Sequence, residues 1–251
     1  MWNVQWLGNC LEEMRKIPDG AIDMVLCDLP YGTTQNKWDS IIELSALWNA
    51  YWRICKGVIV LTAAQPFTSA LVMSNLADFN HNWTWVKSRA TGHLNAKRQP
   101  MRATEDVLVF KPNGIGIYNP QGLREKSRPT IRKGNKGNGT NYGDSAVDAV
   151  QTHENYPINV LDISSEGKNV HPTQKPVALM EYLIRTYTNE GMTVLDNCMG
   201  SGTTGVACIN TNRNFVGIEQ DEKYFQIACK RIEEAKAKLV VPTENNWVGI
   251  E

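Results

Sequence analysis

The sequence has no long apolar run, no Cys-x-x-Cys pair and no excess of either charge. No stretch reaches the roughly 18 apolar residues that cross a bilayer, so we expect no membrane span. The first ten residues, MWNVQWLGNC, lack the charged segment and apolar core of a secretory signal. The six cysteines are scattered, and three lie in apolar runs, which indicates reduced and buried thiols. We therefore expect a protein of the cytoplasm.

Charge and histidine placement narrow the function classes further. The 26 lysines and arginines equal the 26 aspartates and glutamates, so the whole chain carries no electrostatic signal for nucleic acid or membranes. The charge is nevertheless uneven, because residues 86–136 hold 12 basic and three acidic residues, a net charge of +9. A solvated loop would explain an isolated basic run, whereas one concentrated block favours a polyanion as the partner. The four histidines have no metal-ligand spacing, and we expect no metal site.

Apolar runs of strand length alternate with amphipathic segments of helical length, which is the pattern of an α/β sheet. A chain of 251 residues that is 42% hydrophobic can bury a sizeable core. The predicted strands are residues 4–7, 22–27, 57–62, 83–87, 106–110, 193–196 and 215–219. The predicted helices are residues 40–55, 176–188 and 221–239, where apolar side chains recur three and four positions apart.

One region interrupts this alternation. Residues 111–170 are rich in glycine, proline and basic residues and show no clear period. We interpret this region as an insertion or a mobile loop, with residues 1–110 and 171–251 as the two halves of the main domain.

The segment TVLDNCMGSGTTGVACINTNRNFVGIE predicts a nucleoside cofactor. Its first apolar strand ends at Asp196. The glycines that follow, Gly200, Gly202 and Gly205, match the G-x-G-x-x-G spacing. Such a loop lets the backbone approach a ligand closely, and Glu219 at the end of the next strand can accept hydrogen bonds from ribose hydroxyls. A tight turn without a ligand is the weaker interpretation, because strand, acid, loop, helix, strand and acid occur together in this order.

Asp196 helps to distinguish two classes of cofactor. Nicotinamide dinucleotides and S-adenosylmethionine both use a glycine loop and a ribose-binding acid. A carboxylate directly before the loop is a poor neighbour for a pyrophosphate but attracts the ammonium group of a methionine moiety. The sequence therefore favours S-adenosylmethionine.

Three motifs give the chain a resemblance to a known family. DLPYG at residues 28–32, HPTQKP at 171–176 and DNCMGSGTTG at 196–205 resemble motifs of the DNA amino-methyltransferases. Their order resembles the circularly permuted β class, and DLPYGTTQNKWD resembles phage and prophage members in particular. The resemblance implies a doubly wound, Rossmann-like sheet of seven strands, one of them antiparallel, with S-adenosylmethionine as the methyl donor. It also implies that residues 111–170 recognise the DNA sequence, between a catalytic half and a cofactor-binding half.

The resemblance makes the tetrapeptide Asp28-Leu29-Pro30-Tyr31 the catalytic motif. The lone pair of an exocyclic amino group is delocalised into the base, and two hydrogen-bond acceptors can localise it. The resemblance assigns these roles to the Asp28 carboxylate and the Leu29 carbonyl, with Pro30 stiffening the turn. It implies that Tyr31 stacks on a base flipped out of the duplex. Taken alone, Asp-x-Pro-Tyr is only a good turn sequence, and the partner motifs favour the chemistry.

The resemblance also suggests side chains at the cofactor, in addition to the glycine loop, Asp196 and Glu219. These are Asn9, Asp28, Thr173, Lys175, Thr203 and Thr204. Thr173 and Lys175 are expected at the carboxylate of the methionine end, and Asn9 at the adenine ring. The chain departs from the family pattern where Leu29 replaces a proline and Cys198 replaces an aromatic residue. We expect a looser turn and weaker cofactor binding from these departures.

Double-stranded DNA is the expected partner, contacted mainly by basic residues. The expected contacts are Lys37, Trp38, Arg98, Arg102, Arg124, Arg128, Arg132 and Lys133. A packed loop anchor is an equally open role for Trp38. By analogy with the family, a homodimer and a cognate restriction endonuclease are further expected partners.

Three functions remain open on the sequence. Methylation of adenine N6 is favoured, because aspartate at the first tetrapeptide position is commoner in the adenine members that the chain resembles. Methylation of cytosine N4 uses the same scaffold and more often has serine there. A catalytically silent DNA-binding module is the third, and Leu29 and Cys198 are its only support.

Overall fold

The structure is a computed structural model of the whole chain. It describes residues 3–32, 41–114, 116–134, 148–164 and 174–240.

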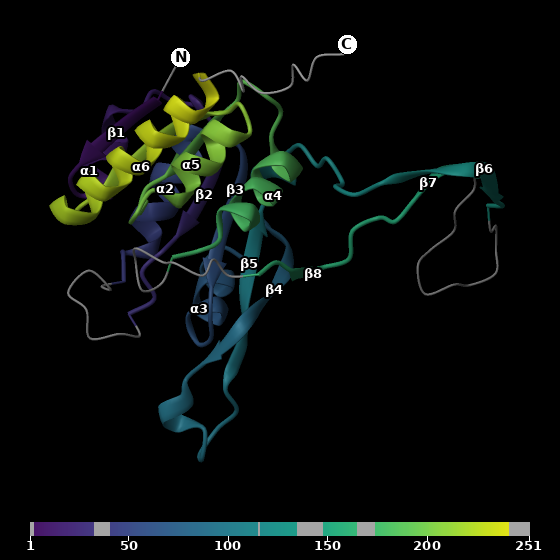
Figure 1. Cartoon of the computed structure of the whole chain (residues 1–251), viewed down its shortest axis with the longest axis horizontal. Coiled ribbons are helices and arrows are strands. Elements are labelled where there is room, and N and C mark those ends of the chain that lie inside the picture. The colour runs from purple at the N-terminus through teal and green to yellow at the C-terminus, as the bar shows by residue number, and fades with distance from the viewer. Residues whose placement is uncertain (1–2, 33–40, 115, 135–147, 165–173, 241–251) are drawn as a thin grey trace, which may run out of the picture. The chain divides into compact units, whose positions relative to one another are not determined.

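The core of the fold is an eight-stranded sheet with the order β1-β10-β9-β2-β3-β5-β4-β8 (Figure 1). β5 is antiparallel to both of its neighbours, and the other strand pairs of this sheet are parallel. The strands are β1 Asn3–Leu7, β2 Ile22–Asp28, β3 Cys55–Ala63, β4 Phe79–Thr91, β5 Arg102–Phe110, β8 Val160–Asp162, β9 Thr193–Asp196 and β10 Asn214–Glu219. A mainly parallel sheet of this kind confirms the predicted fold class.

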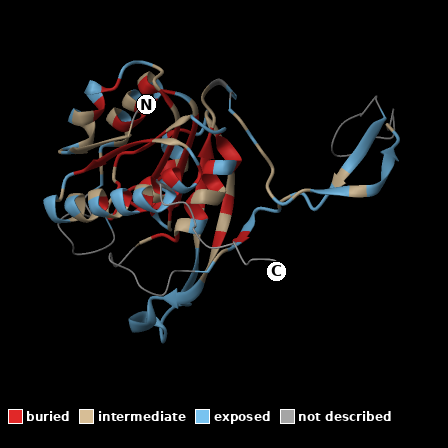
Figure 2. Cartoon of the chain, turned by 45° about the horizontal axis from the view of Figure 1, so that its top comes forward, coloured by how far each residue is buried: buried red, intermediate tan, exposed pale blue. Residues whose placement is uncertain are grey.

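Helices cover both faces of the sheet, as its central strands require. The helices are α1 Cys10–Glu13, α2 Leu44–Ile54, α3 Phe67–Ser74, α4 Val177–Tyr187, α5 Thr203–Asn210 and α6 Glu222–Val240. Short 3₁₀ helices span Met14–Lys16, His93–Asn95 and Pro112–Gly114. Successive residues of β2 enter two different cores, because side chains alternate across a strand. Met24 and Leu26 pack with α4, α5 and α6, whereas Val25 and Cys27 pack with α2 and α3. Buried residues concentrate in the sheet and in the helices that cover it (Figure 2).

All seven predicted strands and the three predicted helices are present, with ends that differ by a few residues. The prediction missed β8, so the sheet has one strand more than the seven expected. β8 has three residues, of which only Leu161 is buried, and this is too short for a period to be visible. The prediction also missed the short helices α1 and α3.

The two central strands β2 and β9 form a topological switch point. They are hydrogen-bonded neighbours, with Met24 opposite Val194. From β2 the chain continues through α2 to β3 on one side, and from β9 it continues through α5 to β10 on the other. Ligands of open α/β sheets bind at the carboxyl ends of strands at such a point. The predicted tetrapeptide follows β2 and the predicted glycine loop follows β9, so both lie at this edge.

Residues 88–104 form a long exposed hairpin, which we call the arm. β4 and β5 pair beyond the sheet as far as Thr91 and Arg102, and the tip turns at Gly92, whose φ is +89°. Every residue of the arm is exposed. Because β4 runs parallel to β2 and β3, the arm extends beyond the carboxyl edge of the sheet. It is the hairpin that projects below the sheet in Figure 1.

Pro120–Ile158 forms a second compact unit, and the rest of the chain forms the first. In the second unit, β6 Arg124–Arg132 and β7 Ala149–Glu154 make an antiparallel pair, with a register shift between Glu125 and Thr130. The unit lies inside the predicted insertion 111–170. Whether that insertion reads DNA sequence stays a prediction.

None of the helices in the described residues combines the length and apolar character needed to cross a bilayer. The six cysteines are free, and Cys27, Cys55 and Cys208 are buried.

Candidate active site

Asp28 lies at the carboxyl end of β2 and accepts three hydrogen bonds through its two oxygens. Oδ1 accepts from the Tyr31 hydroxyl at 2.8 Å and from the hydroxyl of Thr62, its register partner on β3. Oδ2 accepts from the Lys175 ammonium at 2.7 Å. The side chain is still 25% exposed. Asp28 is therefore a fixed hydrogen-bond acceptor that solvent can reach at the sheet edge.

Tyr31 lies beside this carboxylate with its ring packed against an aromatic neighbour. Its ring stacks on Phe67 with 5.4 Å between centroids, and its hydroxyl oxygen also lies 3.2 Å from the Thr62 hydroxyl oxygen. Burial, together with the charge of Asp28, raises the pKa of the Tyr31 phenol well above its usual value. The hydroxyl thus stays protonated and holds Oδ1 of Asp28 in place.

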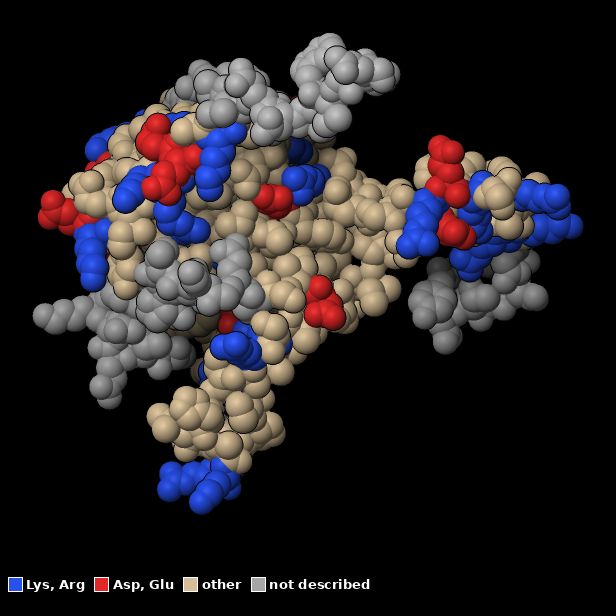
Figure 3. All heavy atoms as spheres, viewed as in Figure 1, with Lys and Arg blue, Asp and Glu red and all other residues tan. Residues whose placement is uncertain are grey.

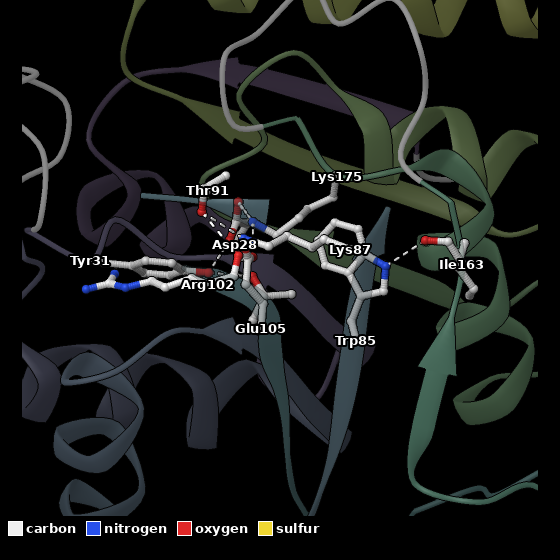
Figure 4. A network of polar contacts seen from close by, with 10 residues as sticks. Asp28, Tyr31, Trp85, Lys87, Thr91, Arg102, Glu105, Ile163 and Lys175 are labelled. Atoms are coloured by element: carbon white, nitrogen blue, oxygen red, sulfur yellow. Dashed lines mark hydrogen bonds and ion pairs between the residues drawn. The ribbon is translucent and has the colours of Figure 1, made fainter. Parts of the chain in front are cut away.

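Lys175, which precedes α4, lies between two carboxylates (Figure 4). Its Nζ is 2.7 Å from Oδ2 of Asp28 and 3.2 Å from Oε2 of Glu105, and its side chain is only 6% exposed. The other Glu105 oxygen pairs with Lys87 at 3.1 Å. Burial lowers the pKa of Lys175, but Asp28 and Glu105 outweigh burial and hold it above its usual value. We expected Lys175 at the cofactor carboxylate, and the structure places it on Asp28. Thr173 lies outside the described residues.

The glycine loop is held by the two acids predicted at the cofactor. The Gly200 amide donates to Oε2 of Glu219 at 2.8 Å. The Thr204 hydroxyl donates to Oδ2 of Asp196 at 2.6 Å, and the Cys198 amide donates to Oδ1 at 3.1 Å. Thr203 is buried at the start of α5. Both acids therefore fix the loop to the ends of β9 and β10.

Two glycines of this loop are required for different reasons. Gly202 has φ +79°, and a Cβ there would lie 2.8 Å from Cβ of Ala228 on α6. Gly200 has φ +51°, and a Cβ there would meet no atom within 4 Å. Both positions need the left-handed conformation that glycine adopts readily. In addition, Gly202 packs closely against a helix, while Gly200 lies beside open space.

Burial changes the acidity of the loop carboxylates. Asp196 is 3% exposed, and burial raises its pKa from 3.8 to about 7 although Thr204 and Cys198 donate to it. Burial also raises the pKa of Glu219. No lysine or arginine of the described residues is among the largest causes of either shift, in contrast to the ammonium on Asp28.

The carboxyl edge brings together residues from distant parts of the sequence. Leu7 pairs with Glu219 in register, so Asn9, two residues beyond β1, lies at this edge. The Asn9 side chain accepts from the Leu11 amide at 2.9 Å and caps α1. In sheet order the edge presents Asn9, Glu219, Asp196, Asp28, Thr62, Glu105 and Lys87. Of the predicted cofactor residues, Asn9, Glu219 and Asp196 occupy one half of this series, whereas Asp28, predicted in both roles, lies in the other half with the tetrapeptide and its partners.

The predicted DNA contacts divide between the arm and the second unit. Arg98 and Arg102 are exposed on the arm. Arg124, Arg128 and Arg132 are exposed on β6, and Lys133 follows them. Figure 3 shows basic side chains at the tip of the arm and on the second unit. Lys37 and Trp38 lie outside the described residues.

Sequence reasoning missed several residues that hold the site. Arg231 on α6 donates to the Ser201 carbonyl at 2.6 Å, and Tyr51 on α2 donates to Asn197 at 2.6 Å. Thr62, Glu105 and Lys87 were also missed. Thr62 ends the apolar run of β3, next to β2, and the end of such a run can be located from the sequence. Glu105 precedes the apolar part of an antiparallel strand, and no sequence signal marks its partner.

Within the described parts of the chain, no group of three or more His, Cys, Asp or Glu side chains is arranged to hold a metal ion.

Comparison with known proteins gives matches over most of the chain. The DNA methylase family model matches residues 22–230. The DNA adenine methyltransferase YhdJ of Escherichia coli (strain K12) is 27% identical over 254 residues, covering 91% of this chain and 82% of YhdJ. The type II methyltransferase M.HpaI of Haemophilus parainfluenzae is 26% identical over 246 residues, covering 90% of this chain and 72% of M.HpaI.

A solved structure agrees with these matches. The crystal structure of the M1.HpyAVI–SAM complex is 26% identical in sequence and superposes with a TM-score of 0.65, covering 92% of this chain and 100% of that chain.

Proposed function

Because the chain belongs to the DNA methylase family, we propose that it transfers the methyl group of S-adenosylmethionine to adenine N6 at specific sites in double-stranded DNA. One observation carries the proposal. The Asp28 carboxylate lies at the end of β2, and the predicted cofactor loop follows β9, the neighbouring strand at the topological switch point. An acceptor for the target amine and a binding site for the methyl donor are thus adjacent.

Asp28 is suited to activate an exocyclic amine. Its Oδ1 is fixed by Tyr31 and Thr62, so the carboxylate is oriented before a substrate arrives. An N–H of the amine would donate to this carboxylate and the second N–H to the Leu29 carbonyl, which localises the nitrogen lone pair. Positioning of the amine against the methyl group is then the main catalytic contribution.

The residues around the glycine loop fit S-adenosylmethionine. The open space beside Gly200 lets a ligand approach the loop backbone. The Glu219 oxygens accept hydrogen bonds from the Gly200 and Asp221 amides and retain capacity for ribose hydroxyls. We assign Asp196 to the methionine end, where the ammonium of a bound cofactor would favour the charged form of a carboxylate that otherwise titrates near neutrality. Thr203, Thr204 and Asn9 lie at the same edge. The bound cofactor supplies an electrophilic methyl group on its sulfonium.

Adenine N6 is favoured over cytosine N4 as the methylated atom. YhdJ, which aligns with 91% of the chain, is named a DNA adenine methyltransferase. The tetrapeptide of this chain begins with Asp28, in agreement with the sequence expectation for adenine. Cytosine-N4 methylation is the alternative that product analysis separates.

The arm and the second unit are each suited to contact DNA. The arm carries Arg89, Lys97, Arg98 and Arg102 and no acidic residue, and it extends beyond the edge that holds Asp28. In the second unit, β6 presents three exposed arginines. Phosphate contacts from such residues supply affinity, whereas base contacts supply sequence preference.

The chain's partners and location follow from this function. DNA is its substrate, and a homodimer and a cognate restriction endonuclease are part of the proposal by family analogy. We also expect it in the cytoplasm, where free thiols stay reduced.

The test is incubation of the purified protein with labelled S-adenosylmethionine and mixed-sequence DNA, followed by nucleoside mass spectrometry and mapping of modified positions. We expect N6-methyladenine at one recurring motif. If N4-methylcytosine is found instead, the target base is cytosine and not adenine. Failure to bind the cofactor would favour the silent DNA-binding module.

The Asp28→Asn variant tests the assigned catalytic residue. The amide keeps the shape of the carboxylate but loses its charge, so we expect the rate of methyl transfer to fall by about 100-fold or more. Cofactor affinity, measured by calorimetry, should stay within a few fold of wild type. Equal turnover by the variant would remove Asp28 from the chemistry.

A further inference from the structure

Glu105 belongs to the ionic cluster around Asp28 although it lies 77 positions away in the sequence. It is the carboxylate on the far side of Lys175, 3.2 Å from the ammonium that contacts Asp28 at 2.7 Å. Its side chain is 17% exposed, and that of Lys175 is 6% exposed. A buried ammonium is thus shared by two carboxylates, of which the proposed mechanism uses only Asp28 (Figure 4).

The two carboxylates are unequally satisfied. Asp28 receives hydrogen bonds from Tyr31, Thr62 and Lys175. Oε2 of Glu105 is buried and has no hydrogen-bond partner among the described residues, although the ammonium lies at ion-pair distance. Lys175 is therefore bonded mainly to Asp28 in this state, and Glu105 offers it a second acceptor nearby.

Lys175 occupies positions that a target base needs. Its ammonium takes lone pairs of Oδ2 of Asp28, the carboxylate proposed to accept an amine N–H. The ammonium also lies over the Tyr31 ring, 5.8 Å from the centroid, and Phe67 already stacks on that ring. A base that stacks on Tyr31 and donates to Asp28 thus competes with Lys175 at both places.

A shift of Lys175 to Glu105 resolves this competition without leaving a buried charge unpaired. One charge-assisted hydrogen bond to a carboxylate replaces another. Without the Glu105 charge, withdrawal from Asp28 would leave an ammonium buried and unpaired, which is strongly unfavourable. Asp28 and Glu105 together hold the pKa of Lys175 above its usual value, so the group that would shift is a charged ammonium.

We propose that Glu105 is a positioning residue that draws Lys175 away from Asp28 when the target amine binds. This inference rests on the proposed methyl transfer and adds to it a residue outside the three motifs that indicated the family. Glu105 does not touch the reacting atoms and acts through Lys175 alone.

The first test is the single-turnover rate of methyl transfer by Glu105→Gln at saturating cofactor and DNA. The amide keeps the size of the side chain but removes its charge, so Lys175 stays on Asp28, and we expect a rate at least tenfold lower. Cofactor and DNA affinities should stay within about twofold. A variant as fast as wild type would overturn the inference.

Asp106→Asn is the matched control. Asp106 is the next residue of β5, points to the opposite face of the strand, and accepts from Thr68 at 2.9 Å. Its amide variant loses the same charge without touching Lys175. We expect its rate within twofold of wild type, and a loss equal to that of Glu105→Gln would assign the effect to net charge.

A double variant separates positioning from a structural role. Adding Lys175→Met to Glu105→Gln removes the group that blocks Asp28, so the double variant should be at least threefold faster than Glu105→Gln. All rates are measured well below each variant's unfolding temperature. A double variant no faster than Glu105→Gln would contradict the proposed shift.

Lysine-ammonium NMR gives a readout that needs no turnover. With S-adenosylhomocysteine present, target-containing DNA should move the Lys175 Nζ signal in wild type but not in Glu105→Gln. An unmoved wild-type signal would overturn the shift. Failure of the proposed function is distinguishable, because it appears as a wild-type protein that methylates no DNA.

Discussion

Asp28 and Asp196 end neighbouring strands, yet their surroundings give them different chemistry. Asp28 has an ammonium at 2.7 Å and is 25% exposed. Asp196 is 3% exposed, and its oxygens accept from the Thr204 hydroxyl and the Cys198 amide. A buried carboxylate without a paired cation binds its proton more tightly. One aspartate is therefore available as a charged acceptor, while the other holds the loop and titrates near neutrality.

The Asp196 environment predicts a specific dependence of stability on pH. Its pKa is about 7 in the folded chain against an ordinary value of 3.8, so the folded state binds the proton more tightly. This contribution to stability is complete below pH 3.8 and is lost as the pH rises through 7. Between pH 5 and pH 8 we expect this group to lower the free energy of unfolding by on the order of 3 kcal/mol.

Urea unfolding of wild type and Asp196→Asn at the two pH values measures this contribution. The amide carries no titrating proton, so the variant should lose that part of the pH dependence while other groups contribute equally to both proteins. Equal pH dependence in the two proteins would show that Asp196 is not protonated near neutrality.

The roles of residues were predictable where a local sequence pattern, such as the end of an apolar strand, also gives the position in the fold. Asp196 and Glu219 were found because each ends an apolar strand beside the glycine loop, and Asp28 was found because its tetrapeptide resembles a family motif. The pairing of Lys175 with Asp28 and Glu105 was not, because it depends on the register of β3, β5 and β4 across the sheet. The Asn9 cap of α1 and the hydrogen bond from Arg231 to the glycine loop likewise could not be predicted, because both depend on tertiary packing.

At the scale of elements, the glycine loop combines close packing on one side with open space on the other. Gly202 meets α6 at Ala228, and Gly200 meets nothing within 4 Å. The loop is therefore both a joint between β9 and α5 and a surface that a ligand can approach.

Three alanine variants separate these two properties. Gly20 has φ +65°, and a Cβ added there would have no atom within 4 Å, so Gly20→Ala reports the backbone cost alone, about 1–2 kcal/mol. Gly200→Ala should cost the same stability but weaken cofactor binding at least tenfold. Gly202→Ala adds overpacking against Ala228, for a total of about 2–5 kcal/mol. Denaturant unfolding and calorimetry measure both effects, and unchanged cofactor binding by Gly200→Ala would contradict the assigned site.

The arm predicts a salt-dependent share of DNA affinity. Lys97 and Arg98 lie near its exposed tip. Each phosphate contact contributes about 0.9 to the slope of log affinity against log salt. Replacing both residues by glutamine should therefore weaken binding and lower the slope by about 1.8.

Lys223→Gln with Lys230→Gln is the control for the arm. Both lysines are exposed on α6, so replacing them removes the same charge from an element that is not part of the arm. We expect their slope to equal that of wild type. If the arm variant also keeps the wild-type slope, the arm does not contact phosphates.

At the scale of the whole molecule, periodicity predicted the sheet because its central strands are apolar on both faces. The alternation of Met24 and Leu26 with Val25 and Cys27 between two cores makes β2 a continuous apolar run. β8 and the second unit lacked such a signal. Both strands of that unit are mostly exposed, and a two-stranded pair has no buried face to produce a pattern.

The pairing of β2 with β9 also sets when the protein can mature during translation. Met24 pairs with Val194, which is synthesised about 170 residues later, so the centre of the sheet is incomplete until then. At synthesis rates of about 5–20 residues per second, this interval lasts about 10–30 seconds. During this time, the edge of β2 that later pairs with β9 has no hydrogen-bond partner, although both faces of β2 are apolar. We therefore expect this edge of β2 to need protection in the nascent chain until β9 has been made.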